Sequence, residues 1–320
     1  MTNDKPEGRS ISGLLNLRQR RGGHGGPPLQ IFYMKLVTTL SAVLLIVAAI
    51  FGSFRQPTLW QEKSAGRWQL IWSDEFDYKG PPDPAKWSYD VGGHGWGNQE
   101  LQYYTARRKQ NARVENGRLI IEARQDGWHG HRYTSARLIS KGKGDWLYGR
   151  FEVSAKLPSG RGTWPAIWML PSQRSYGEGG WPDNGEIDIM EHVGFDPDVV
   201  HASIHTRAFY HSIGTQKTAK IKVPTARTGF NVYAMEWSAQ EIRTYVNDQH
   251  YFTFTNTQLH DPMKDFKQWP FDKPFHLILN IAIGGTWGGS QGVDPSIWPQ
   301  RMEVDYVRVY KSNQVSKAEF

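Results

Sequence analysis

Short runs of alternating or β-branched residues recur along most of this chain, and they restrict its fold class more than any other feature. Gly, Pro, Asn and Asp separate these runs, and no long segment keeps the 3.6-residue apolar period of an amphipathic helix. Many short strands in one domain predict a sandwich or a barrel. We therefore expect an all-β domain over residues 68–311, followed by a short tail, 312–320. The clearest predicted strands cover residues 117–123, 148–157, 230–237, 241–246, 276–282 and 302–310.

A continuous uncharged segment near the N-terminus predicts a transmembrane or signal helix. Residues 36–54 would extend roughly 28 Å as a helix, close to the thickness of the apolar core of a bilayer. Residues 1–35 are polar, Gly-rich and basic, which favours a disordered cytoplasmic tail. We favour an uncleaved anchor because no clean A-x-A cleavage site follows, and a signal peptide beginning at Met34 is the alternative. In both cases the residues after the linker 55–67 are membrane-anchored outside the cytoplasm, secreted or periplasmic.

The composition excludes several classes of protein. Without cysteine, the chain uses neither disulfides nor thiolate metal sites. The net charge is +7, of which residues 1–35 hold +4, and no basic and aromatic residues interleave as in a nucleic-acid-binding surface. We expect a monomer with no nucleic-acid partner. The 14 tryptophans suggest a surface that stacks on sugar rings, with an aromatic-rich sandwich core as the alternative.

Three acidic residues crowd one short predicted strand, Glu186-Ile-Asp188-Ile-Met-Glu191. Glu186 and Asp188 share a face of a regular strand, whereas Glu191 falls on the other face unless a β-bulge near Ile189 and Met190 adds one residue. Neighbouring like charges raise pKa values, and glycoside hydrolysis needs one ionised and one protonated carboxyl group. A solvated acidic strand face would not explain the apolar residues between the acids. A Ca²⁺ site would suit a loop better than a strand.

This acidic motif and several others, in the same order along the chain, resemble glycoside hydrolase family 16. The form of the motif with one extra residue before the last Glu is typical of its laminarinases, which are endo-β-1,3-glucanases, and also of its agarases and carrageenases. The resemblance implies a jelly-roll β-sandwich (concanavalin A-like) with an open concave cleft, and retaining endo-hydrolysis of β-1,3-glucan without a catalytic cofactor. It implies that Glu186 is the nucleophile, that Glu191 is the acid/base and that Asp188 assists them. The other resembling segments are 72–77, 98–105, 149–171, 282–289 and 302–310.

Further residues are predicted to hold the β-glucan. Sugars stack on aromatic faces and accept hydrogen bonds from planar polar groups. Trp164 and Trp168 share a strand face, for which core packing is the alternative, and Trp287 stands in a glycine-rich loop that favours exposure. The resemblance adds to these the cleft residues Asn98, Arg137, Trp181 and His205.

The resemblance also implies a structural Ca²⁺ site on the convex face, at Glu75, Gly117 and Asp305, partly through backbone carbonyls. Two alternatives to a laminarinase remain open. One is another specificity of the same family, such as mixed-linkage β-glucan or galactan, and the other is a non-catalytic β-glucan-binding protein. Non-catalytic relatives lack the acids that this chain retains, so the deciding observation is whether Glu186 and Glu191 face one cleft.

Overall fold

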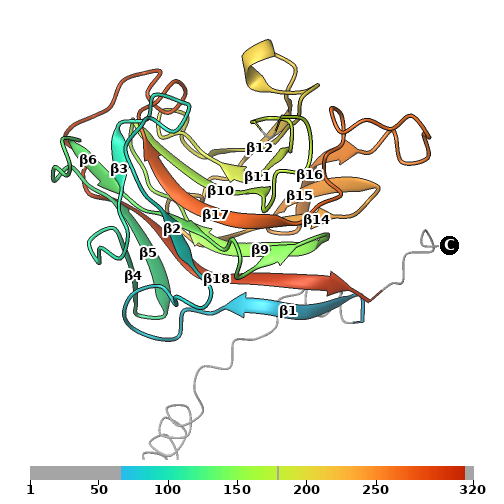
Figure 1. The fold of residues 1–320 in the computed structure, drawn as a ribbon. Helices are drawn as coiled ribbons and strands as arrows, with labels where there is room; N and C mark the ends of the chain where they lie inside the picture. The colour runs from blue at the N-terminus through green and yellow to red at the C-terminus, as the bar shows by residue number, and fades with distance from the viewer. Residues whose placement is uncertain (1–65, 179, 314–320) are drawn as a thin grey trace, which may run out of the picture. The chain divides into compact units, whose positions relative to one another are not determined.

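The computed structural model describes residues 66–178 and 180–313, which form a sandwich of two antiparallel sheets (Figure 1). A third, small sheet pairs β3 (Gln102–Tyr104) with β6 (Tyr133–Ser135) in parallel. The described residues contain no α-helix, and a single 3₁₀ turn, η1, covers His211–Ile213. The expected all-β sandwich is therefore confirmed.

The predicted tail 1–35 and the predicted helix 36–54 lie outside the described residues. Most of the linker 55–67 and of the tail 312–320 lies outside them as well. Within the part of the chain that the structure describes, no helix is long and apolar enough to cross a bilayer. The anchor and the signal peptide stay predictions.

One sheet, here called the back sheet, has the strand order β16-β15-β14-β9-β18-β5-β4, and β1 pairs with β18 (Figure 1). Five of the predicted strands fall in it, with ends that differ by at most a few residues. Its strands are β1 (Trp68–Asp74), β4 (Ala112–Glu115), β5 (Arg118–Ala123), β9 (Gly149–Lys156), β14 (Asn231–Trp237), β15 (Glu241–Val246), β16 (Gln249–Thr255) and β18 (Gln300–Ser312).

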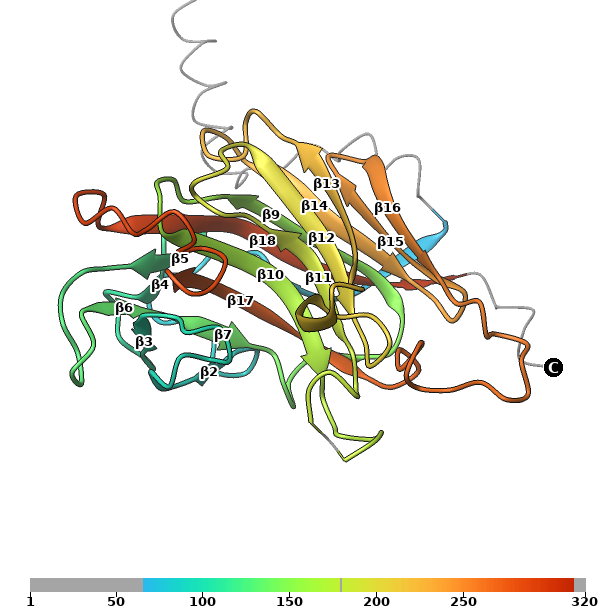
Figure 2. The same ribbon diagram turned by 90° about the horizontal axis from the view of Figure 1, so that it is seen from above.

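The other sheet, here called the cleft sheet, has the order β13-β12-β11-β10-β17-β7-β2, and β8 pairs with β17. The chain passes from β9 in the back sheet to β10–β13 in the cleft sheet, and returns to the back sheet for β14–β16. It then passes to the cleft sheet for β17 and back again for β18 (Figure 2). Such crossings are typical of a jelly roll. The strands are β2 (Ser88–Asp90), β7 (Arg137–Ile139), β8 (Asp145–Trp146), β10 (Thr163–Pro171), β11 (Glu186–Glu191), β12 (Val199–His205), β13 (Lys217–Lys222) and β17 (Phe275–Ile283).

Strand β10 shows how the two-residue period divides core from cleft. Ile167 and Met169 are fully buried in the core between the sheets. Trp164 and Trp168 alternate with them and are only partly buried. Because successive side chains of a strand point to opposite faces, the apolar core fixes which residues of β10 face outward. The same alternation in β17 directs Asn280 away from the core.

Candidate active site

A cleft of about 570 Å³ lies over the outward face of the cleft sheet. Strands β10, β11 and β17 supply its floor, and the connections before β3 and between β10 and β11 supply further lining residues. The side chains of Glu186, Asp188 and Glu191 all line it. The two glutamates therefore face one cleft.

A β-bulge in β11 brings the third acid to this face. Between Asp188 and Glu191, β11 advances three residues while β12 advances two, from Ser203 to His201. The pairing with β10 shifts at the same place, and Ile189 and Met190 are both buried in the core. The bulge predicted near these two residues is thus confirmed. It returns Glu191 to the face of Glu186, which strict alternation would prevent.

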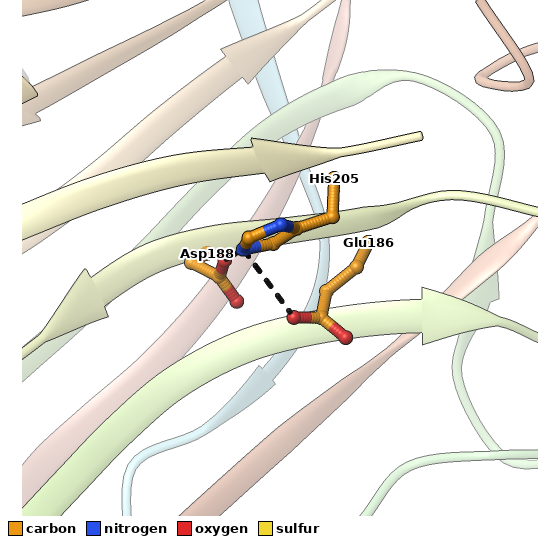
Figure 3. Close-up of side chains that lie close together, drawn as sticks. All are labelled: Glu186, Asp188 and His205. Carbon is orange, nitrogen blue, oxygen red and sulfur yellow. Dashed lines mark ion pairs between the residues drawn. The ribbon is translucent and has the colours of Figure 1, made fainter. Parts of the chain in front are cut away.

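His205 lies between two of the acids, as Figure 3 shows. Its Nε2 is 3.4 Å from Oδ2 of Asp188 and 3.9 Å from Oε1 of Glu186. The register pairs His205 directly with Glu186 across β11 and β12. The histidine therefore contacts the carboxylates themselves, and its hydrogen bonding to a sugar in the cleft stays a prediction.

Two indole groups hold the two glutamates. Trp181 Nε1 donates to Glu186 Oε2 at 3.0 Å, and Trp164 Nε1 donates to Glu191 Oε1 at 3.1 Å. Trp181 is 45% exposed, so its ring is open to a ligand while its N–H is occupied. Both bonds favour the ionised carboxylate, because an N–H group can only donate.

Burial raises the pKa of all three acids. Desolvation, assisted by the charge of Asp188, raises the pKa of Glu186 and that of Glu191 to about 8. Desolvation alone raises the pKa of Asp188 to about 8. His205 and the indole donors oppose the rise at the two glutamates. A site in which carboxyl groups exchange protons near neutral pH suits acid/base chemistry.

Arg137 fills the part of the cleft next to β7. Its guanidinium lies 4.7 Å from the ring centre of Trp96 and 4.6 Å from that of Trp168. An ion pair of 2.9 Å with Asp90 completes its contacts. Asn98 lines the cleft nearby. Held on both faces, the guanidinium presents its edge in a defined direction, which suits hydrogen bonding to a sugar hydroxyl.

A hydrogen-bond network under Trp168 was missed by sequence reasoning. Trp168 Nε1 donates to Asn280 Oδ1 at 2.7 Å, and Asn280 Nδ2 donates to the hydroxyl of Tyr104 at 3.0 Å. Tyr104 in turn donates to Glu100, which lines the cleft. One signal was available, since Asn280 interrupts an otherwise apolar run in β17. Other unpredicted lining residues are Trp96, Arg174, His211 and Ser212.

Trp287 is partly buried and is not among the residues that line the cleft. Its ring packs edge-on against Trp164 at 5.4 Å and against His201 at 5.0 Å. The surrounding glycines thus allow close packing, where the sequence had suggested exposure. A direct contact of Trp287 with the sugar stays a prediction, while its contact with Trp164 supports the indole that binds Glu191.

The calcium residues implied by the resemblance lie near the back sheet. Arg308 holds both oxygens of Glu75, at 2.8 and 2.9 Å. A carboxylate in such a paired contact is not available to a cation, so Glu75 offers only its backbone carbonyl. Gly117 lies in the turn between β4 and β5, and Asp305 lies in β18. The calcium site stays a prediction that depends on the Asp305 carboxylate and backbone carbonyls.

One other group of residues has the spacing of metal ligands. Ligand atoms of Glu186, Asp188 and His205 lie within 4.8 Å of one another. The indole of Trp181 already occupies one oxygen of Glu186. The raised pKa values show that the site tolerates protonated carboxyl groups, which bind cations poorly. The arrangement therefore fits proton exchange better than metal binding.

Comparison with known proteins places these features in context. Residues 99–308 match the family described as glycosyl hydrolases family 16. A β-glucanase of Rhodothermus marinus is 59% identical over 285 residues, which are 89% of this chain and 98% of that protein. The solved laminarinase from Rhodothermus marinus is 64% identical with a TM-score of 0.76, covering 77% of this chain and 98% of that one. A non-specific endo-β-1,3(4)-glucanase, whose structure was solved with 1,3-β-D-cellotriosyl-glucose, is 46% identical with a TM-score of 0.72. The match covers 76% of this chain and 95% of that one.

Proposed function

The chain belongs to glycosyl hydrolase family 16, and on that premise we propose that it hydrolyses internal bonds of β-1,3-glucan with retention of configuration. The observation that carries the proposal is the bulge in β11, which directs Glu186, Asp188 and Glu191 into one cleft. Retaining hydrolysis uses two carboxyl groups on one scissile bond. The similarity to a laminarinase and to a β-glucanase supports the choice of substrate.

In the first step, the Glu186 carboxylate attacks the anomeric carbon and the bond to the leaving oxygen breaks. The protonated Glu191 gives its proton to that oxygen, and a covalent glycosyl-enzyme remains. The Trp181 hydrogen bond supports the ionised Glu186 that the attack requires. Burial raises the pKa of Glu191 and of Glu186 alike, so the crowded acids retain protons near neutral pH, and the proposed mechanism places one of them on Glu191.

In the second step, the ionised Glu191 takes a proton from water, and the water oxygen attacks the anomeric carbon. The ester bond to Glu186 breaks, and the carboxylate returns to its starting state. Two inversions at one carbon leave the β-configuration unchanged. Asp188 acts through His205 and through its charge on both glutamates, which makes it a positioning residue.

The cleft also carries the contacts that internal cleavage requires. Trp96, Trp168 and Trp181 line it at separate points, so several sugar units can bind at once. A non-catalytic glucan-binding protein would not need three acids with raised pKa values in that cleft. One similar enzyme is described as non-specific between β-1,3 and β-1,4 linkages. Mixed-linkage glucan is therefore the second candidate substrate.

We propose further that the enzyme acts outside the cytoplasm, since its polymeric substrate does not cross a membrane. The uncharged segment 36–54 supports this location, either as an anchor or as part of a signal peptide.

The test is hydrolysis of laminarin, lichenan and agarose by the full chain, with Glu186→Gln as the inactive control. We expect laminarin to be cut fastest, with oligosaccharides of several lengths appearing early. NMR of the first products should show the β-anomer. An initial α-anomer would indicate inversion and remove Glu186 as nucleophile, and faster cleavage of agarose would overturn the substrate assignment.

A further inference from the structure

A second cavity, of about 430 Å³, lies outside the catalytic cleft, within the range of roughly 300–1,000 Å³ typical of ligand pockets. It is here called the side pocket. The long connection between β16 and β17, orange in Figure 2, contributes most of its lining. The turn between β14 and β15 adds Ala239, the β10–β11 connection adds Tyr176, and Tyr148 comes from just before β9.

The side pocket combines apolar ring surface with polar groups that have no partner. Phe266 and Trp269 form part of its wall, and Trp269 is 8% exposed. Within the described residues, no hydrogen bond or ion pair involves the Tyr148 hydroxyl, the Lys264 ammonium or Nε2 of Gln258. Lys264 is exposed, and Tyr148 and Gln258 are partly buried, so these groups are open to solvent and available to a ligand in the pocket.

The polar groups identify the class of ligand. Asp265 lies 3.7 Å from Lys267, and Asp272 lies 3.9 Å from Lys273, so nearby lysines balance the acidic groups. Among the described lining residues, Lys264 is the one charge left without an ionic partner, and because it is exposed, water and salt screen it, so the pocket selects only weakly for an anion. A neutral ligand that carries many hydroxyl groups and one flat apolar face matches this lining, and a sugar unit has both properties.

The side pocket and the catalytic cleft each take lining residues from the β10–β11 connection, here called the shared wall, although no single residue lines both. Arg174 and Trp181 of the β10–β11 connection line the cleft, whereas Tyr176 of the same connection lines the side pocket. Tyr176 is held there by its hydrogen bond to Asp272 and by stacking on Phe266, with ring centres 5.3 Å apart. The same connection therefore faces both cavities, and a polymer bound in the cleft contacts an element that also lines the side pocket.

We propose that the side pocket is a second glucan-binding site, which holds part of the polymer away from the acids. The inference rests on the proposed function, because it takes the same polymer as ligand. A second contact on one polymer raises the overall affinity without changing the chemistry. Short oligosaccharides cannot use both sites, so they gain nothing from the side pocket.

The experiment compares polymer binding with oligosaccharide turnover. Affinity electrophoresis in laminarin-containing gels uses the full chain with Glu186→Gln, so that the polymer stays intact. Ala239→Trp fills the side pocket without removing a side-chain contact, and Lys264→Ala removes one of its unpaired groups. Gln240→Met is the matched control, since Gln240 is an exposed neighbour of Ala239 outside the lining. The same substitutions in the active enzyme are assayed on a laminari-oligosaccharide.

We expect Ala239→Trp and Lys264→Ala to weaken laminarin binding about threefold or more, with kcat/KM on the oligosaccharide unchanged. Gln240→Met should change neither laminarin binding nor kcat/KM on the oligosaccharide. Unchanged laminarin binding in both pocket variants would overturn the second site and leave the proposed function intact. A parallel loss of oligosaccharide turnover would also overturn it, because the pocket would then act through the shared wall. Absence of laminarin hydrolysis by the unmodified enzyme would instead refute the proposed function.

Discussion

Nε1 of Trp181 donates a hydrogen bond to Oε2 of Glu186 over 3.0 Å, from a position only five residues earlier in the chain. The residue that walls the cleft thus also favours the charged form of the carboxyl group beside it. Trp164 has the same relationship to Glu191, at 3.1 Å. Each of the two carboxyl groups proposed for the chemistry therefore has its own indole donor, and the two donors come from different elements.

This pairing predicts separate effects on the two limbs of the pH profile. Trp181→Phe should raise the pKa of Glu186 and move the acidic limb of kcat/KM upward, by about 0.5–1 pH unit for a bond of about 1 kcal/mol. Trp164→Phe should raise the pKa of Glu191 and move the alkaline limb upward instead. The control is Trp168→Phe, whose indole donates to Asn280. Limbs that move together, or not at all, would contradict the assignment.

Removing the acids should separate their roles. Glu186→Gln should lower kcat about 10³-fold or more on laminarin and on an aryl glucoside alike, because no glycosyl-enzyme forms. Glu191→Gln should lower it about 10²–10⁴-fold, and less on an aryl glucoside whose leaving group needs no proton. Steady-state kinetics on both substrates measures the difference. Equal losses for both variants on both substrates would argue against Glu191 as the acid, and unchanged melting curves would show that the fold is intact.

The buried acids should make stability depend on pH. Burial raises the pKa of Glu186 from 4.5 to about 8, so the folded state binds more protons than the unfolded state between these values. The free energy of unfolding therefore falls as the pH rises through this window. Glu186→Gln cannot ionise, and above pH 8 its melting temperature should exceed that of the wild type by about 2–4 °C for ~1 kcal/mol.

Below pH 4.5 the difference between Glu186→Gln and the wild type should vanish, because the wild-type carboxyl group is then protonated in both states. Differential scanning calorimetry at pH 4, 6 and 9 measures the effect. The exposed Glu178→Gln serves as the control for loss of one acidic group. A variant less stable than the wild type at pH 9 would show that Glu186 ionises without cost in the folded protein.

Location gives a further prediction. Cell fractionation and protease treatment from outside should find the catalytic domain accessible, because the segment 36–54 is predicted to direct it across the membrane. An anchored chain would remain with the membrane fraction, whereas a cleaved one would be released. Recovery of the full-length chain from the soluble cytoplasm would refute both forms of the prediction.

Features with a local period could be predicted from the sequence. Alternation along β10 and β17 is visible in the residues themselves, because each side chain of a strand faces opposite to its neighbours. The bulge in β11 followed from the same rule, since three acids can share one face only with an extra residue among Ile189 and Met190. Crowding of like charges on one short strand predicted acid/base chemistry there, and the resemblance to family 16 supplied the separate roles of Glu186 and Glu191.

Contacts between distant segments were decided by the tertiary structure alone. Asn280 and Tyr104 form one hydrogen bond across 176 positions of sequence, and no periodic pattern connects them. Arg308 pairs with the Glu75 carboxylate across 233 positions, and no local pattern predicted this contact at a residue expected to bind calcium. The edge-on contact of Trp287 with Trp164 also joins distant segments, and no sequence pattern predicted it. Such partners depend on how the two sheets and their connections pack, because side-chain distances are set by the whole fold rather than by neighbours in the chain.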